Sequence, residues 1–148
     1  MTKSTKIKRL LAEAMGMVGT RYEYGAYTKK DSGKKPNSVD CSSLIQYIFS
    51  VVGVKLPRST ILQAAQGREI KHIKNIEPGD LIFFEGTRGH YSHKKFKGKK
   101  VYVGHAAFYV GNGKVIDAEE DRGDVREITL KSITARPFYK IVLIKRYV

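Results

Sequence analysis

Apolar residues recur at helical spacing in the first part of the chain. The first such stretch covers residues 5–18 and predicts a helix whose last turn is weakened by Gly16 and which stops at Gly19. A second helical pattern begins just after Cys41 and is expected to end near Gly53. The apolar positions of the two helices are Ile7, Leu10, Leu11, Ala14, Met17, Val18, Leu44, Ile45, Ile48, Phe49 and Val52.

A short third helix and two loops are predicted around these elements. Ser59 is a good N-cap, because its hydroxyl can accept a hydrogen bond from a free backbone N–H, and a helix is predicted over residues 61–65. Residues 25–39 contain glycine, proline, asparagine and several lysines and predict a loop that leads into the cysteine helix. Residues 85–100 predict a second, long and basic loop.

Strand-like patterns follow the helical ones. Residues 77–80 predict a turn, and residues 81–84, which are all apolar, predict a short buried strand. Residues 101–110 and 114–119 predict two strands that flank Gly-Asn-Gly, a strong hairpin signal, and residues 140–148 predict a last strand. Helices that precede strands favour an α+β domain with an antiparallel sheet. Without repeats or linkers, the whole chain, residues 1–148, is predicted to form one domain.

The length of the hairpin loop decides which residues share a face of the sheet. A two-residue loop at 112–113 would place Asp117 on the side opposite His105. A three-residue loop at 111–113, with a left-handed last glycine, puts Asp117 and Glu119 on the face of His105. Its pairs are Val110 with Lys114, Ala107 with Asp117 and His105 with Glu119. Because glycine occupies both ends of the loop, we predict the three-residue form, with His105 and Asp117 diagonal at about 7–8 Å.

Basic residues outnumber acidic ones by two to one. The chain has 28 lysines and arginines against 14 acidic residues, a formal net charge of +14, which predicts an anionic partner or surface. Because no nucleic-acid-binding motif accompanies this charge, nucleic acid is disfavoured as the partner. A polyanionic bacterial envelope would attract such a protein by the same long-range force. No apolar run approaches the roughly 20 residues that span a bilayer.

Cys41 is the single cysteine of the chain and stands directly before the second helical pattern. Asp40 can cap that helix, so the thiol falls in the first turn, where unpaired backbone N–H groups and the helix dipole favour a thiolate. A thiolate is the form that attacks a carbonyl carbon. A buried structural cysteine is the alternative. We predict a nucleophile, because a histidine and a carboxylate farther along can complete a catalytic set.

His105 is the predicted base for Cys41. Asp117 is the predicted group that holds the imidazole in one tautomer and stabilises its charged form. Glu119 is the rival for this second role, since the predicted register puts it on the same face.

The basic loop contains two further histidines and a run of lysines. His90 and His93 have a spacing that invites a metal ion, but a site needs two more ligands and their neighbours are mostly lysines. We therefore predict no metal and no cofactor. The lysines are expected either to be simply solvated or to rim a groove and attract anionic groups of a substrate or surface. They are Lys94, Lys95, Lys97, Lys99 and Lys100.

Five short motifs have an order and spacing that resemble one known family. They are Tyr22-Glu23-Tyr24-Gly25, Asp40-Cys41-Ser42-Ser43, Leu56-Pro57-Arg58-Ser59, residues 78–84 and residues 104–118. The chain thereby resembles the NlpC family of papain-like bacterial cell-wall peptidases over about residues 8–145. The resemblance implies N-terminal helices, including the cysteine helix, packed on a central antiparallel sheet. It also implies hydrolysis of peptidoglycan stem peptides, typically between D-glutamyl and a diamino acid.

The resemblance also assigns roles to the reactive residues. It implies a nucleophile at Cys41 and a base at His105, with Asp117 at the family's third polar position, which is most often a histidine. A carboxylate there would hold the imidazolium more firmly. Tyr22 matches a tyrosine whose hydroxyl lies beside the cysteine, where it could help to polarise the oxyanion.

Further matches concern substrate binding. Asp40 and Ser42 match positions that hold the free amino end of the stem peptide in some members of the family. Arg58 and Ser59 match a pair that lines the groove. Two family glycines are replaced here, by Ser43 and Ala26, which implies a narrower groove on that side.

Other classes of function stay open at this point. A different thiol enzyme on the same architecture would be an amidase, an acyltransferase or a protein-modifying toxin. A silent binding domain would lack Cys41 or His105, and both are present. We expect a monomer that binds peptidoglycan peptides. The basic N-terminus is not followed by an apolar secretory stretch, which leaves the location open between the cell wall and the cytoplasm.

Overall fold

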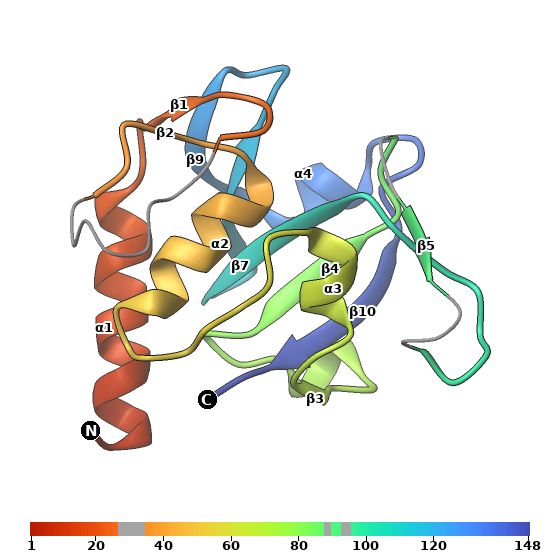
Figure 1. Cartoon of the computed structure of the whole chain (residues 1–148), viewed down its shortest axis with the longest axis horizontal. Helices are drawn as coiled ribbons and strands as arrows, with labels where there is room; N and C mark the ends of the chain where they lie inside the picture. The colour runs from red at the N-terminus through yellow and green to blue at the C-terminus, as the bar shows by residue number, and fades with distance from the viewer. Residues whose placement is uncertain (27–34, 88–89, 93–95) are drawn as a thin grey trace.

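A mixed sheet of mainly antiparallel strands is the centre of the molecule (Figure 1). The computed structural model describes residues 1–26, 35–87, 90–92 and 96–148. The strands in this part of the chain are β1 Arg21–Tyr22, β2 Ser38–Val39, β3 Arg68–Glu69, β4 Leu81–Phe84, β5 His90–Ser92, β6 Val101–Val103, β7 His105–Gly111, β8 Lys114–Glu119, β9 Asp124–Thr129 and β10 Ile141–Arg146. Eight of them form one sheet in the order β2-β1-β9-β8-β7-β4-β10-β3, while β5 and β6 form a separate antiparallel pair. Among the strands of the described residues, β1 and β2 are the one parallel pair.

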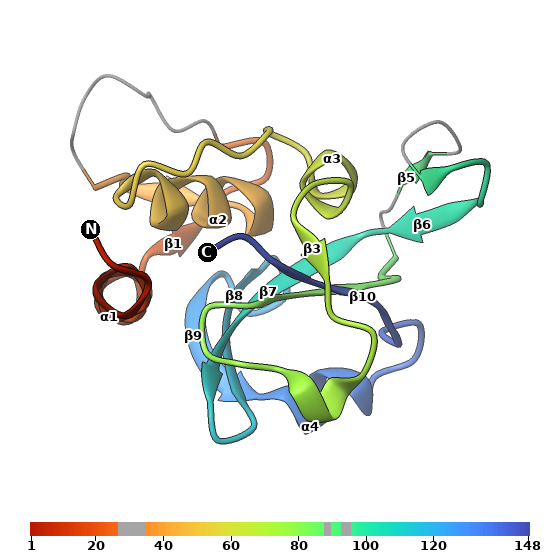
Figure 2. The same ribbon diagram turned by 90° about the horizontal axis from the view of Figure 1, so that it is seen from below.

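Helices cover both faces of the sheet (Figure 2). The helices are α1 Lys3–Gly16, α2 Cys41–Ser50, α3 Thr60–Ala64 and α4 Leu130–Thr134, with a 3₁₀ turn, η1, at Ile73–Asn75. The first three lie on one face, where α2 contacts β7 and β8, and α4 lies on the other. None of the helices in the described ranges combines the length and apolar character needed to cross a bilayer.

Strand β4 joins the two hydrophobic cores. Its four residues are fully buried, and successive side chains of a strand point to opposite faces. Leu81 and Phe83 accordingly pack under α1 and α2, whereas Ile82 and Phe84 pack in the core that includes α4. The uninterrupted apolar run of this strand is thus explained by burial on both sides. The α+β prediction, with the cysteine helix packed on a central antiparallel sheet, is confirmed.

The predicted helices are close to those observed. The first begins at Lys3 instead of residue 5, because the Thr2 hydroxyl accepts a hydrogen bond from the Thr5 N–H at 3.1 Å and caps the helix earlier. It ends at Gly16, two residues before the predicted boundary. The third helix is capped by Ser59 as predicted and begins at Thr60.

The strand predictions were less complete. The predicted loop at 85–100 contains β5, and the predicted strand at 101–110 is broken at Gly104 into β6 and β7. At this break the backbones of Gly86 and Gly104 meet, and a Cβ on Gly86 would lie only 3.1 Å from the Gly104 carbonyl carbon. Strand β9 and helix α4 were not predicted.

The tip of the β7–β8 hairpin differs from the prediction, while its body agrees. Gly111 pairs with Lys114, so the loop has two residues, Asn112 and Gly113, both with positive φ. The predicted pair of Val110 with Lys114 is therefore wrong. The register then shifts by one residue at Val110, and the next pairs are Tyr109 with Val115 and Phe108 with Ile116.

This bulge restores the predicted register in the two pairs that follow it, Tyr109 with Val115 and Phe108 with Ile116. The Tyr109 backbone is fixed from its other side, because its C=O accepts from the Gly79 N–H and its N–H donates to the Asp80 C=O, both at 2.9 Å. Its hydroxyl accepts from the Gly113 N–H at 3.1 Å. His105 and Asp117 consequently reach the same face, as predicted from a loop of the wrong length.

Candidate active site

Cys41 is the first residue of α2 and is partly exposed. The helix start is fixed by a reciprocal cap. The Asp40 carboxylate accepts from the Ser43 N–H at 2.9 Å, and the Ser43 hydroxyl accepts from the Asp40 N–H at 2.9 Å. The predicted cap is therefore confirmed. The serine that replaces a family glycine is the second half of this cap.

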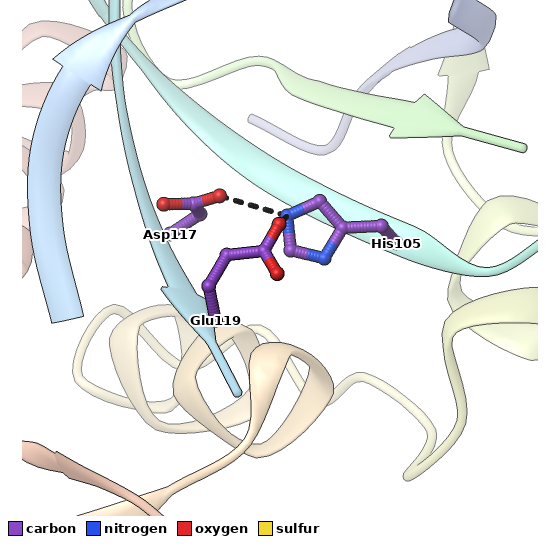
Figure 3. A group of neighbouring side chains, drawn as sticks. All are labelled: His105, Asp117 and Glu119. Atoms are coloured by element: carbon purple, nitrogen blue, oxygen red, sulfur yellow. Dashed lines mark hydrogen bonds and ion pairs between the residues drawn. The ribbon is translucent and has the colours of Figure 1, made fainter. Parts of the chain in front are cut away.

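His105 is the first residue of β7 and lies opposite Phe84 on β4. Its Nε2 lies 2.8 Å from Oδ2 of Asp117 and 3.3 Å from Oε1 of Glu119, both on β8 (Figure 3). The exposed fractions are 5% for His105, 0% for Asp117 and 6% for Glu119. With Nε2 facing the carboxylates, Nδ1 is the nitrogen left for Cys41, which lines the same cleft.

The surroundings of His105 favour its charged form. Burial alone lowers the pKa of the imidazole, but the hydrogen bonds to Asp117 and Cys41, together with their negative charges, outweigh it and raise the pKa well above its usual value. The same contact acts in reverse on Asp117. Burial raises the pKa of that carboxyl, whereas His105 and Arg122 outweigh the burial and lower it. The site therefore stabilises an ion pair of imidazolium and carboxylate.

Two arginines that the sequence analysis did not single out complete this end of the site. Arg122 donates through Nη2 to Oδ1 of Asp117 at 2.5 Å, and Arg136 donates through Nη1 to Oε1 of Glu119 at 2.8 Å. Arg122 follows the end of β8, and Arg136 follows α4. The Asp121-Arg122-Gly123-Asp124 sequence is a turn signal that could have revealed the return strand carrying Arg122 toward Asp117.

Aromatic rings enclose the imidazole. The ring centroids of Phe84 and Tyr139 each lie 5.8 Å from that of His105, and Tyr139 meets it edge to face at 68°. The Arg136 guanidinium lies 4.0 Å from the centroid of the Tyr139 ring. The histidine is thus fixed by rings on its sides and by carboxylates at Nε2.

Asp40, Ser42 and Arg58 form a second polar network next to Cys41. Arg58 donates to Oδ2 of Asp40 at 2.7 Å, to Oγ of Ser42 at 2.6 Å and to the backbone carbonyl of Ala26. Burial raises the pKa of Asp40, but Arg58 and the Ser43 N–H outweigh it and lower that pKa. The Asp40 carboxylate is therefore already paired with Arg58 before any ligand binds in the cleft.

These groups open into one cleft of about 280 Å³. Cys41 and His105 lie in its wall, and Asp117 lies behind the histidine. The cleft brings together all the other predicted site residues: Tyr22, Asp40, Ser42, Arg58 and Ser59. Its wall also includes Tyr24, Glu119, Glu120, Asp121 and Tyr139.

Among the described residues, His105, Asp117 and Glu119 lie close enough to bind a metal ion, with their ligand atoms within 4.8 Å of one another. Both carboxylates already accept hydrogen bonds from arginines, so the cluster has its own cations. This arrangement fits a hydrogen-bonded ion network better than a metal centre. His90 and His93 do not bear on this question, because their side chains lie outside the described residues.

Fold and cleft together define an α+β domain whose cysteine helix packs on an antiparallel sheet and meets a strand histidine. The chain belongs to the NlpC/P60 family, whose model matches residues 19–144.

Curated relatives agree with this assignment. The chain is 32% identical over 121 residues to the γ-DL-glutamyl hydrolase of Bacillus subtilis, covering 80% of this chain and 25% of that protein. It is 32% identical over 112 residues to a probable endopeptidase p60 of Listeria innocua, covering 76% of this chain and 20% of that protein. The chain thus spans a quarter or less of the length of these two relatives.

Solved structures show the same fold. The P60 domain of an antigen from M. avium subspecies paratuberculosis matches with a TM-score of 0.71 and 25% identity, over 97% of this chain and 95% of that one. NlpC2 of Trichomonas vaginalis matches with a TM-score of 0.76 and 26% identity, over 99% of this chain and 48% of that one.

Proposed function

We propose that this protein is a cysteine peptidase that hydrolyses peptidoglycan stem peptides at the bond between D-glutamyl and a diamino acid. Cys41, His105 and Asp117 are the catalytic set, and the 148 residues act as one catalytic domain. The observation that carries the proposal is that Cys41 and His105 line one cleft while Nε2 of His105 lies 2.8 Å from Oδ2 of Asp117. The choice of substrate is supported by relatives that include a γ-DL-glutamyl hydrolase.

The proposed reaction follows from the order in which Cys41, His105 and Asp117 are arranged at the cleft. The Cys41 thiolate attacks the carbonyl carbon of the scissile bond, and the His105 imidazolium gives its Nδ1 proton to the leaving amine. A thioester to Cys41 remains. Neutral His105 then takes a proton from water, whose oxygen attacks the thioester carbon, and the thiolate leaves as the imidazolium is restored. Asp117 stabilises the imidazolium and does not take its proton.

The remaining cleft residues have supporting roles in this proposal. The backbone N–H of Cys41 at the start of α2 and the Tyr22 hydroxyl would stabilise the oxyanion of the tetrahedral intermediate. Asp40 and Ser42, with Arg58 between them, would bind the free amino end of the stem peptide, and Ser59 would line the same subsite. The basic surface would concentrate the protein on anionic wall polymers.

The cleft disfavours one rival. A lipid acyltransferase requires an apolar channel, whereas this cleft contains several ionisable side chains, among them Asp40, Arg58, Glu119 and Asp121. Amidases and protein-modifying toxins use the same chemistry on other acyl groups, and the bond cleaved separates them from the peptidase.

Mass spectrometry of a defined muropeptide tests the proposal directly. Wild-type protein is expected to release a fragment ending in D-glutamate and one beginning with the diamino acid. The Cys41→Ala protein is the matched control and is expected to release neither. An intact muropeptide after incubation with folded wild-type protein would refute the proposed substrate.

A further inference from the structure

One imidazole nitrogen of this site faces two carboxylates. Asp117 uses separate oxygens for its partners, with Oδ2 toward His105 and Oδ1 toward Arg122. Glu119 uses a single oxygen, Oε1, for both, at 3.3 Å from His105 Nε2 and 2.8 Å from Arg136 Nη1. The position of the oxygen that faces the imidazole is therefore fixed directly by Arg136.

Two buried carboxylates this close would repel each other without cations. Each is paired with an arginine, Asp117 through the oxygen away from the imidazole and Glu119 through the oxygen that faces it, so a cation offsets the repulsion on both sides. Arg136 is held in turn by its place over the Tyr139 ring and by an ion pair with Asp121 at 3.5 Å. The segment after α4 thereby reaches the catalytic histidine through one glutamate.

We propose that Glu119, anchored by Arg136, is a second positioning residue for His105 that shares the Nε2–H with Asp117. Arg136 acts through Glu119. When one carboxylate is removed, the other can still accept the hydrogen bond from Nε2–H. Each is therefore expected to compensate in part for loss of the other. The inference rests on the proposed peptidase function for its effect on turnover, but the geometry can be tested without turnover.

The test without turnover is an NMR titration of the histidine rings in a Cys41→Ser background. The chain has only 4 histidines, so the His105 signal can be assigned by comparison with a His105→Ala protein. Glu119→Gln is expected to lower the titration midpoint of His105 by about one pH unit, and Asp117→Asn by more. Glu127→Gln is the matched control, because Glu127 is a strand glutamate that pairs with Lys114 on the surface, and it is expected to leave the midpoint unchanged.

Arg136 is tested with a conservative pair. Arg136→Gln is expected to reproduce the downward shift of Glu119→Gln, since the glutamate loses its anchor. Arg136→Lys keeps the charge without the planar fork, so a partial return toward the wild-type midpoint is expected. A midpoint that is the same in Glu119→Gln, Arg136→Gln and wild type would overturn the proposal, whatever the protein's substrate.

Kinetics supply the second readout. Glu119→Gln is expected to lower kcat by about 3- to 10-fold and to move the alkaline limb of the pH profile to lower pH. The Asp117→Asn, Glu119→Gln double variant is expected to lose more than the product of the single losses, because neither acceptor remains. A double variant whose loss equals the product of the two single losses would contradict the sharing of Nε2–H by Asp117 and Glu119. A shifted NMR midpoint in a protein without peptidase activity would refute the proposed function and leave the positioning role standing.

Discussion

Two buried aspartates, Asp40 in the cleft wall and Asp117 behind His105, are each paired with an arginine, and they differ in what else they bind. The Asp40 carboxylate accepts from the backbone N–H groups of Gly25 and Ser43 and from the Arg58 side chain, so it holds the backbone at the start of α2. Within the described part of the chain, the Asp117 carboxylate accepts only from side chains, those of His105 and Arg122. The same residue type, with a pKa that is lowered at both positions, thus secures a helix in one place and an imidazole in the other.

The largest effects are expected from the two groups that these aspartates support. Cys41→Ala and His105→Ala are each expected to reduce turnover by more than about 1,000-fold, because each removes a reacting group. Neither change should unfold the protein, since Cys41 is partly exposed and His105 belongs to neither of the two hydrophobic core clusters. Circular dichroism and cleavage of a defined stem peptide measure the two outcomes. Near-wild-type turnover by Cys41→Ala would contradict the proposed chemistry.

Substitution of the aspartates themselves tests the comparison most directly. Asp117→Asn is expected to lower kcat by about 10- to 100-fold with little change in KM, because an amide can hold the ring but stabilises its cation less. Asp40→Ala is expected to lower stability by about 1–2 kcal/mol through loss of the cap and to raise KM. Denaturant unfolding and steady-state kinetics on both variants check the split. A loss of kcat in Asp40→Ala and a loss of stability in Asp117→Asn would show that the two roles are exchanged.

A smaller difference is expected in the pH dependence of stability. The stability contributed by the raised pKa of His105 is fully present below about pH 6.5 and is lost as pH rises through the folded-state pKa. The stability contributed by the lowered pKa values of both aspartates is present above about pH 3.9 and is lost as pH falls through the folded-state values.

The two aspartate variants should therefore change different limbs of the stability profile. Asp117→Asn is expected to flatten the alkaline fall as well as the acidic one, whereas Asp40→Asn should flatten only the acidic fall. Melting temperatures measured from about pH 3 to pH 10 provide the test. Profiles that respond identically to the two substitutions would remove the distinction between the capping and the orienting aspartate.

The smallest effect on turnover is expected from the basic segment before β6. Replacement of Lys97, Lys99 and Lys100 by glutamine should weaken sedimentation with purified walls and flatten its salt dependence. Turnover of a small uncharged reporter peptide should change by less than about twofold, because exposed charges are screened at a distance. Unaltered wall binding across a salt series would identify a merely solvated segment. Lys94 and Lys95 of the predicted run lie outside the described residues.

Sequence reasoning was most successful where the structural cause is local. Asp40 and Ser59 were identified as caps because each partner N–H lies three residues ahead, and the helix pattern around them has a fixed period. Arg122 and Arg136 were missed because each reaches its carboxylate only after the chain has turned back toward β8. Arg136 lies 17 residues beyond Glu119, which it holds. Strand β9 and helix α4, which bring it back, have weak patterns in the sequence.

The hairpin shows how a correct outcome can follow from an incorrect detail. The predicted loop had one residue too many, and the observed bulge at Val110 supplies the missing residue elsewhere in the same strand. What the sequence indicated correctly was the number of residues to be accommodated between the two strands. The position at which this residue leaves the ladder depends on the backbone of Gly79 and Asp80, which bonds to Tyr109. These two residues lie outside the hairpin, so the hairpin sequence alone cannot predict the position.

The number of unpaired residues at this tip decides whether Asp117 and His105 lie on the same face of the sheet. One residue more or fewer would place them on opposite faces. Side chains alternate along a strand, so a β7 in which Val110 slipped back into the ladder would keep its hydrogen bonds and its apolar character. It would nevertheless carry Asp117 to the face away from His105. A chain with every proposed catalytic residue intact could thus fold into an inert isomer, distinguished from the active one by the placement of a single valine.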